Sequence, residues 1–140
     1  MTEDTTKSPP IGRLMLIDDN QIDQMLCERL IKRSGLVDEF IGFLSAEEAL
    51  EYLREADLPA ADALLLDINM PRMDGFQFLE VATEELGEKF ARIVVMMLTT
   101  SLDPKDQARA AEFSMVKDYC NKPLLMDYLE KLAILLHEND

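Results

Sequence analysis

Five short apolar runs, each followed by a longer segment with helically spaced apolar residues, divide the chain into repeating units. Apolar runs of this length are typical of strands that are buried on both faces of a sheet. They predict strands over residues 13–17, 40–44, 63–66, 91–98 and 116–120. The intervening segments predict amphipathic helices over residues 21–34, 45–56, 75–86, 103–113 and 125–137.

Capping residues support several of these helix boundaries. Ser45 followed by Glu48 forms a capping-box pattern at the start of the second helix. Asp103 before Pro104 combines a favoured N-cap with a proline in the first turn. Gly35 follows the first helical segment and is a natural end for it.

The alternation of strands and helices predicts a parallel sheet, because each pair of consecutive parallel strands needs a right-handed crossover connection. We therefore expect an α/β, flavodoxin-like doubly wound (βα)5 fold with a five-stranded parallel sheet in the order 2-1-3-4-5. Residues 1–11 are polar and contain Ser-Pro-Pro, which predicts a flexible lead-in. Residues 12–140 would then form a single domain, with no output domain attached.

The composition narrows the possible partners. The 140 residues include 28 acidic and 14 basic side chains, for a formal net charge of −14. Binding to nucleic acid or to an anionic membrane needs clustered Lys and Arg, so we expect neither. Because there is no membrane-length apolar run and no signal peptide, the sequence predicts a cytoplasmic protein. The two cysteines lack metal-ligand spacing and are expected to be reduced, buried thiols.

Polar side chains follow four of the predicted strands. These are Asp18 and Asp19 after the first strand, Asp67 after the third, Thr99 after the fourth and Lys122 after the fifth. The carboxyl ends of parallel strands meet at one edge of the sheet, so these side chains should converge. Three neighbouring carboxylates would repel one another, and Mg²⁺ is their natural counter-ion. A carboxylate nucleophile, a metal ion, an ammonium group and a hydroxyl together suit phosphoryl transfer to an aspartate.

Four segments that carry these residues resemble, in their order along the chain, the receiver domain of two-component response regulators. They read LIDDN, DINMPRMDG, LTTS and DYCNKP, and the resemblance covers residues 13–137. It implies a stand-alone response regulator of the CheY-like type that accepts a phosphoryl group on Asp67. The phosphoryl donor would be a sensor histidine kinase or a histidine phosphotransfer protein.

The resemblance also implies a set of metal ligands. Asp19 would bind Mg²⁺ (or Mn²⁺) directly, Asp18 would bind it directly or through water, and the Asp67 carboxylate and the Asn69 backbone carbonyl would complete the protein ligands. Asn69 and Ser101 match family positions that tune the rate of dephosphorylation.

Other roles implied by the resemblance concern the response to phosphorylation. Thr99 would donate to the phosphoryl group, Lys122 would pair with it, and Pro123 would follow a cis peptide bond. Tyr119 matches an aromatic switch position whose ring turns inward when the threonine moves. Thr99 is preferred to Thr100 as the switch hydroxyl because it directly follows the apolar run.

The expected output is protein binding through the surface of helix 103–113, strand 116–120 and helix 125–137, by a monomer or a weak homodimer. A phosphate sink or a phosphorylation-independent adaptor would have the same fold. A Mg²⁺-dependent phosphatase with an aspartate nucleophile needs a second acid two positions later, where this chain has Asn69. We therefore expect no enzymatic turnover apart from phosphorylation and dephosphorylation of Asp67 itself.

Overall fold

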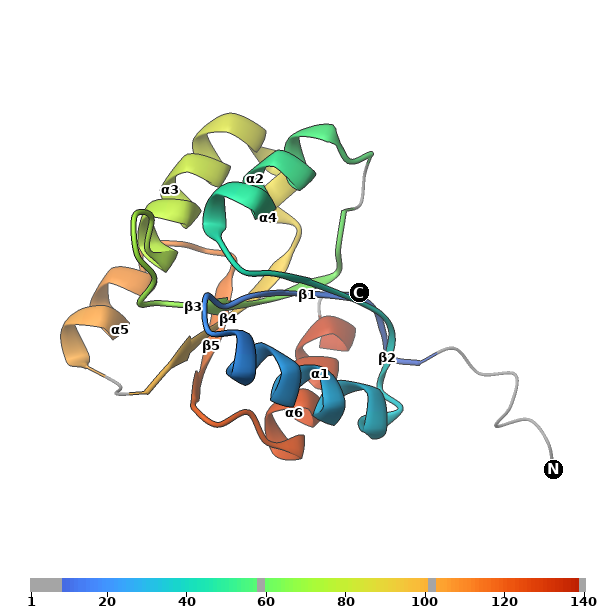
Figure 1. The fold of residues 1–140 in the computed structure, drawn as a ribbon. Coiled ribbons are helices and arrows are strands. Elements are labelled where there is room, and N and C mark those ends of the chain that lie inside the picture. The colour runs from blue at the N-terminus through green and yellow to red at the C-terminus, as the bar shows by residue number, and fades with distance from the viewer. Residues whose placement is uncertain (1–8, 58–59, 101–102, 139–140) are drawn as a thin grey trace, which may run out of the picture.

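Five parallel strands form the sheet in a computed structural model of the protein, which describes residues 9–57, 60–100 and 103–138 (Figure 1). Their order is β2-β1-β3-β4-β5, and every neighbouring pair is parallel. The predicted fold class and strand order are therefore confirmed. The strands are β1 (Ile11–Ile17), β2 (Val37–Phe43), β3 (Ala63–Asp67), β4 (Val94–Thr99) and β5 (Val116–Asn121).

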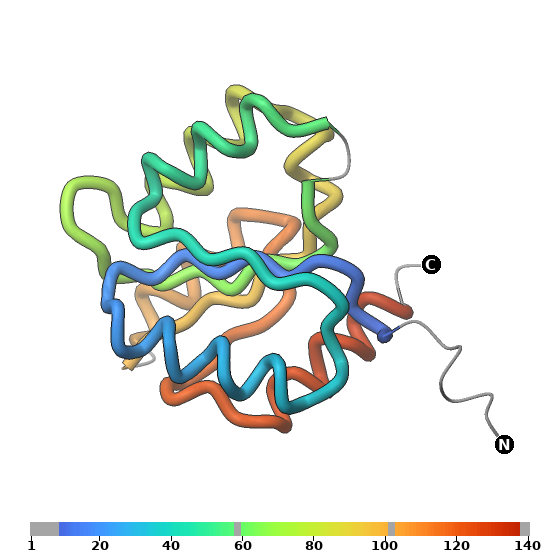
Figure 2. The backbone as a smooth tube through the Cα atoms, turned by 45° about the vertical axis from the view of Figure 1, so that its right-hand side comes forward, coloured from blue at the N-terminus to red at the C-terminus, as the bar shows by residue number. Residues whose placement is uncertain are grey.

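Helices cover both faces of this sheet (Figures 1 and 2). The helices are α1 (Gln21–Ser34), α2 (Ala46–Glu55), α3 (Gly75–Leu86), α4 (Glu88–Ala91), α5 (Pro104–Ala110) and α6 (Met126–Glu138). Leu64 and Leu66 of β3 pack on the side of α2 and α3, whereas Leu65 packs on the side of α1 and α6. Alternate residues of a strand point to opposite faces of the sheet. Because helices cover both faces, all three leucines are fully buried. Among the described residues, no helix is long and apolar enough to cross a membrane.

The predicted cap residues accept backbone hydrogen bonds at the starts of α2 and α5, and the bond at α2 is one of the two that make a capping box. The Ser45 hydroxyl accepts a hydrogen bond from the backbone N–H of Glu48 at 3.2 Å, and the Asp103 carboxylate accepts one from that of Lys105 at 2.9 Å. Gly35 follows α1 with a left-handed φ of 71°, a conformation in which glycine has no Cβ penalty.

Four predicted boundaries differ from the structure by two residues or more. Strand β2 begins at Val37, three residues earlier than predicted. Strand β1 begins at Ile11, which is buried and pairs with Val37, so this residue belongs to the domain and not to the lead-in. Residues 1–8 of the expected lead-in lie outside the described residues. Strand β4 begins only at Val94, because residues 88–91 form the short helix α4 and bury Phe90 against Phe78. Helix α5 ends at Ala110, three residues earlier than predicted.

Helix α1 has the predicted bounds, but most of its large apolar residues do not face the sheet. Cys27 and Ile31 are its buried residues. Ile22, Met25 and Leu26 are 64%, 46% and 54% exposed. The apolar spacing therefore predicted the helix correctly and its buried face only in part.

Candidate functional site

Three carboxylates meet where the order of the sheet reverses, between β1 and β3. Asp18 directly follows β1, and Asp67 is the last residue of the neighbouring strand β3. Asp18 is fully buried and Asp67 is 5% exposed, whereas Asp19 is exposed to solvent. One carboxylate oxygen from each of the three lies within 4.8 Å of the others. This set of hard oxygen donors fits a cation such as Mg²⁺.

Lys122 brings a positive charge to these acids from the carboxyl end of β5. Its Nζ lies 2.9 Å from Asp18 Oδ2 and 3.5 Å from Asp67 Oδ2. Its backbone N–H donates to the Thr99 carbonyl at 2.7 Å, which ties this position to the end of β4. The peptide bond between Lys122 and Pro123 is cis, as predicted. The structure thus brings together the acids and the lysine that the sequence singled out.

The electrostatics of the site follow from burial and crowding. Burial raises the pKa of Asp67 to about 7, against the opposing effects of the Lys122 ammonium and the Asn69 N–H, while Asp18 and Asp19 raise it further. Burial alone would lower the pKa of Lys122, but the neighbouring carboxylates outweigh it and raise this pKa to about 12. Lys122 is therefore charged at neutral pH, and a bound cation would favour the ionised form of Asp67.

The loop after β3 folds back tightly on Asp67. The backbone N–H of Asn69 donates to Asp67 Oδ1 at 3.4 Å, and that of Gly75 donates to the Ile68 carbonyl at 2.9 Å. A Cβ atom on Gly75 would lie 2.6 Å from the Asp67 carbonyl oxygen, closer than real Cβ contacts allow. Glycine at position 75 therefore permits the close approach that sets the direction of the acid.

The two neighbouring threonines have different surroundings. Thr99 is the buried last residue of β4 and pairs in register with Asn121. Thr100, the alternative to Thr99 in the sequence analysis, is exposed and lines the same cavity as Asp67 and Lys122. Ser101, the predicted rate-tuning position, lies outside the described residues.

Tyr119 connects β5 to the neighbouring helix. Its side chain is partly buried, and its hydroxyl donates to the Gln107 carbonyl of α5 at 3.2 Å. Tyr119, the residue that matches the aromatic switch position, is therefore in contact with α5.

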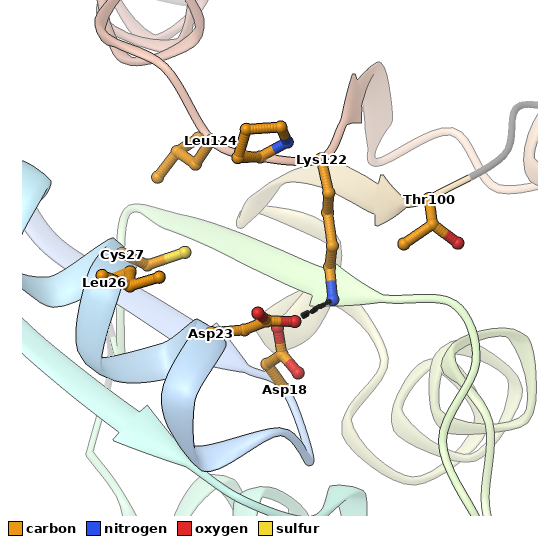
Figure 3. A pocket seen from close by; sticks show the side chains of 8 residues that line it. Asp18, Asp23, Leu26, Cys27, Thr100, Lys122 and Leu124 are labelled. Atoms are coloured by element: carbon orange, nitrogen blue, oxygen red, sulfur yellow. Dashed lines mark hydrogen bonds and ion pairs between the residues drawn. The ribbon is translucent and has the colours of Figure 1, made fainter.

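Sequence reasoning missed one charged residue of the site. Asp23, in the first turn of α1, places Oδ2 3.4 Å from the Nζ of Lys122. It also lines a cavity of about 300 Å³ between α1 and the segment that joins β5 to α6, together with Leu26 and Leu124 (Figure 3). Only its position close after the acid pair could have drawn attention to it.

Comparisons with known proteins agree on one family. Residues 14–133 match the family described as response regulator receiver domain. The hybrid signal transduction histidine kinase L of Dictyostelium discoideum is 29% identical over 116 residues, which are 81% of this chain but 7% of that protein. A probable methanogenesis regulatory protein of Methanothrix harundinacea is 31% identical over 123 residues, or 84% of this chain and 76% of that protein.

A solved structure shares the fold over almost its whole length. The two-component response regulator from Cytophaga hutchinsonii has 29% sequence identity and a TM-score of 0.86, and the match covers 91% of this chain and 98% of that one.

Proposed function

Because the chain belongs to the response regulator receiver domain family, we propose that it is a signalling switch that accepts a phosphoryl group on Asp67. The donor is a histidine kinase or a histidine phosphotransfer protein. The observation that carries this proposal is the buried Asp67 carboxylate, which lies beside Asp18 and Asp19 and 3.5 Å from the Lys122 ammonium.

In the proposed reaction, an oxygen of the Asp67 carboxylate attacks the phosphorus of a phosphohistidine. A P–O bond forms to Asp67, the P–N bond breaks, and its electron pair stays on the imidazole. Asn69 and Gly75 orient the carboxylate by the contacts described above. Lys122 pairs with one oxygen of the transferred group, and Thr99 donates to another.

The oxygen donors at the end of β1 and β3 fit Mg²⁺ (or Mn²⁺). Asp18, Asp19 and Asp67 are the acids that would hold it. The family resemblance adds the Asn69 backbone carbonyl to them. Bound there, the ion supplies positive charge that neutralises the oxygens of the phosphoryl group. The raised pKa of Asp67 supports this assignment, because it reflects burial and an excess of negative charge that a cation would relieve.

A protein donor suits the surface beside the site. Leu26 is exposed and lines the same cavity as Lys122, and the large apolar side chains of Ile22 and Leu125 are also exposed. An exposed apolar side chain that lines a polar cavity, as Leu26 does, favours contact with a partner protein. The phosphoryl group could then be delivered without first crossing bulk solvent.

The proposed output is a change in protein binding at α5, β5 and α6. The hydrogen bond between Tyr119 and the Gln107 carbonyl supports this route, because it links the strand that ends beside Lys122 to α5. A coupling of about 1–3 kcal/mol between phosphorylation and binding would suffice. If Thr99 is the switch hydroxyl, Thr99→Ala should abolish the NMR shift of Tyr119 on phosphorylation, and Thr100→Ala should preserve it.

Phosphorylation by a small donor tests the proposal directly. Wild type incubated with acetyl phosphate and Mg²⁺ should gain the mass of one phosphoryl group, and Asp67→Asn should not. Asp38→Asn makes the same change at an exposed position on β2 and should be labelled like wild type. Equal labelling of Asp67→Asn would refute the acceptor assignment. Sustained hydrolysis of a phosphate monoester would indicate a phosphatase instead.

A binding experiment distinguishes the switch from a phosphate sink. Pull-down with and without beryllofluoride, a phosphoryl mimic, should recover a partner that depends on the mimic and is not the phosphodonor. A sink would yield no such partner, and an adaptor would bind its partner equally in both conditions.

A further inference from the structure

The Lys122 ammonium is shared among three carboxylates that differ in their burial. It donates hydrogen bonds to Asp18 at 2.9 Å and to Asp23 at 3.4 Å, and it forms an ion pair with Asp67 at 3.5 Å. The side chains of Asp18 and Asp67 are 0% and 7% exposed, whereas that of Asp23 is 41% exposed. Asp23 is thus the partner on the solvent side of the lysine.

The local structure of α1 explains why Asp23 faces Lys122. Asp23 is at the third position of α1, where an acidic side chain commonly bonds back to the backbone N–H of the N-cap residue. Here the N-cap is Asn20, and its N–H instead donates to Asp18 Oδ1 at 2.9 Å. The Asp23 carboxylate is directed toward Lys122, as Figure 3 shows.

We propose that Asp23 is a positioning residue that holds an N–H of Lys122 in the resting protein and yields it to the phosphoryl group on Asp67. This inference rests on the proposed function. Of the two acids that accept hydrogen bonds from Lys122, Asp18 is fully buried. Loss of its pairing with Lys122 would leave a buried carboxylate with neither that ion-pair partner nor access to water. Asp23 can return to water at a small cost because it is partly exposed.

Two effects of Asp23 then oppose the phosphorylated state. The pairing of Lys122 with the phosphoryl group is offset by the lost pairing with Asp23, and the Asp23 charge repels the incoming anion. Neutral Asn at this position should remove both effects. Because a partly exposed ion pair contributes little, Asp23→Asn should tighten beryllofluoride binding by about two- to fivefold.

The test is a calorimetric titration of the Mg²⁺-loaded protein with beryllofluoride. Asp23→Asn should bind two- to fivefold more tightly than wild type, by the estimate above, and Asp23→Glu should restore an affinity near that of wild type. Glu28→Gln removes the same charge from α1 at a residue that pairs with Lys32 instead, and it should leave the affinity unchanged. Unchanged or weaker binding by Asp23→Asn, or an equal gain in Glu28→Gln, would overturn the proposal.

A second measurement reads the resting contact without any phosphoryl mimic. The ¹⁵N resonance of the Lys122 ammonium should shift in Asp23→Asn and its protons should exchange faster, while Glu28→Gln leaves both unchanged. An identical Lys122 spectrum in Asp23→Asn would show that the contact is not populated and would refute the proposal. Failure of wild type to bind beryllofluoride would refute the proposed function itself, a result separate from the ratio between variants.

Discussion

Replacement of Asp67 by Asn tests how much the fold is destabilised by holding a carboxylate at this position. Burial is the main cause that raises the pKa of Asp67 to about 7. The folded, metal-free protein therefore keeps a proton at Asp67 over a pH range in which the unfolded chain has lost it. Because the folded protein binds this proton more tightly, proton binding at Asp67 stabilises the fold. This contribution to the free energy of unfolding is complete below the unfolded pKa of 3.8 and is lost as the pH rises through about 7.

The size of the effect follows from the two pKa values. The pKa of Asp67 is 3.8 in the unfolded chain and about 7 in the folded protein. Compared with a neutral side chain, the ionised Asp67 therefore lowers the free energy of unfolding by at most about 4 kcal/mol at pH 8. Asn has nearly the same shape and no charge, and Lys122 keeps Asp18 at 2.9 Å as a partner. Because neighbouring groups relax around the native carboxylate, we expect Asp67→Asn to stabilise the fold by about 2–4 kcal/mol at pH 8 and by about 1 kcal/mol or less at pH 4.5.

Urea unfolding followed by circular dichroism, with a chelator present, measures this difference. Contributions from groups far from Asp67 are the same in both proteins and cancel in the comparison. Asp38→Asn, at an exposed site, should change the free energy of unfolding by less than about 0.5 kcal/mol. Added Mg²⁺ should stabilise wild type and narrow the gap. The reasoning would be refuted if Asp67→Asn were no more stable than wild type at pH 8, or if the gap were the same at both pH values.

Three further predictions concern the metal site, the loop and the thiols. Asp19→Asn should weaken Mg²⁺ binding by at least about tenfold in calorimetry, and Asp38→Asn should not; equal affinities would remove Asp19 from the ligand set. Gly75→Ala should cost about 1–3 kcal/mol in urea unfolding, because its Cβ would approach the carbonyl at the end of β3 to 2.6 Å, and a neutral result would contradict this close approach. Burial raises the pKa of Cys27 to about 11 and that of Cys120 to about 12. Both thiols should therefore react slowly with a disulfide reagent in the folded protein at pH 8 and rapidly in urea. A fast reaction in the folded protein would contradict their burial.

The fold could be predicted from the sequence because a strand that is buried on both faces of the sheet has apolar residues at consecutive positions. The run Leu64–Leu66 is apolar at consecutive positions, which is unusual for a strand with one face in water. The short helix α4 escaped prediction because four residues are too few to show a helical period. The exposed face of α1 was also missed, since spacing alone does not say which apolar stripe meets the sheet.

The site was predictable where a residue follows a strand directly and less so where side-chain direction decides. Asp18, Asp67 and Lys122 meet because the sheet is parallel, whatever the details of their loops. The contrast between buried Thr99 and exposed Thr100 depends on the rotation of the chain as it leaves β4. Asp23 contacts Lys122 while the backbone N–H of Asn20 donates to Asp18 and not to Asp23. The spacing of residues along the sequence does not predict which acid this N–H binds.

One imbalance of charge connects the stability of this protein to its proposed chemistry. Among the described residues, the Lys122 ammonium lies beside the carboxylates of Asp18, Asp23 and Asp67, and Asp19 adds a fourth carboxylate next to Asp18 and Asp67. Their mutual repulsion destabilises the metal-free fold, and a bound cation relieves it. Under the proposed function, a phosphoryl group would add further negative charge, which a bound cation and the Lys122 ammonium would offset. Affinity for Mg²⁺, tolerance of a phosphoryl group and the stabilising effect of Asp67→Asn should therefore all diminish together as the pH falls below 7 and Asp67 becomes protonated.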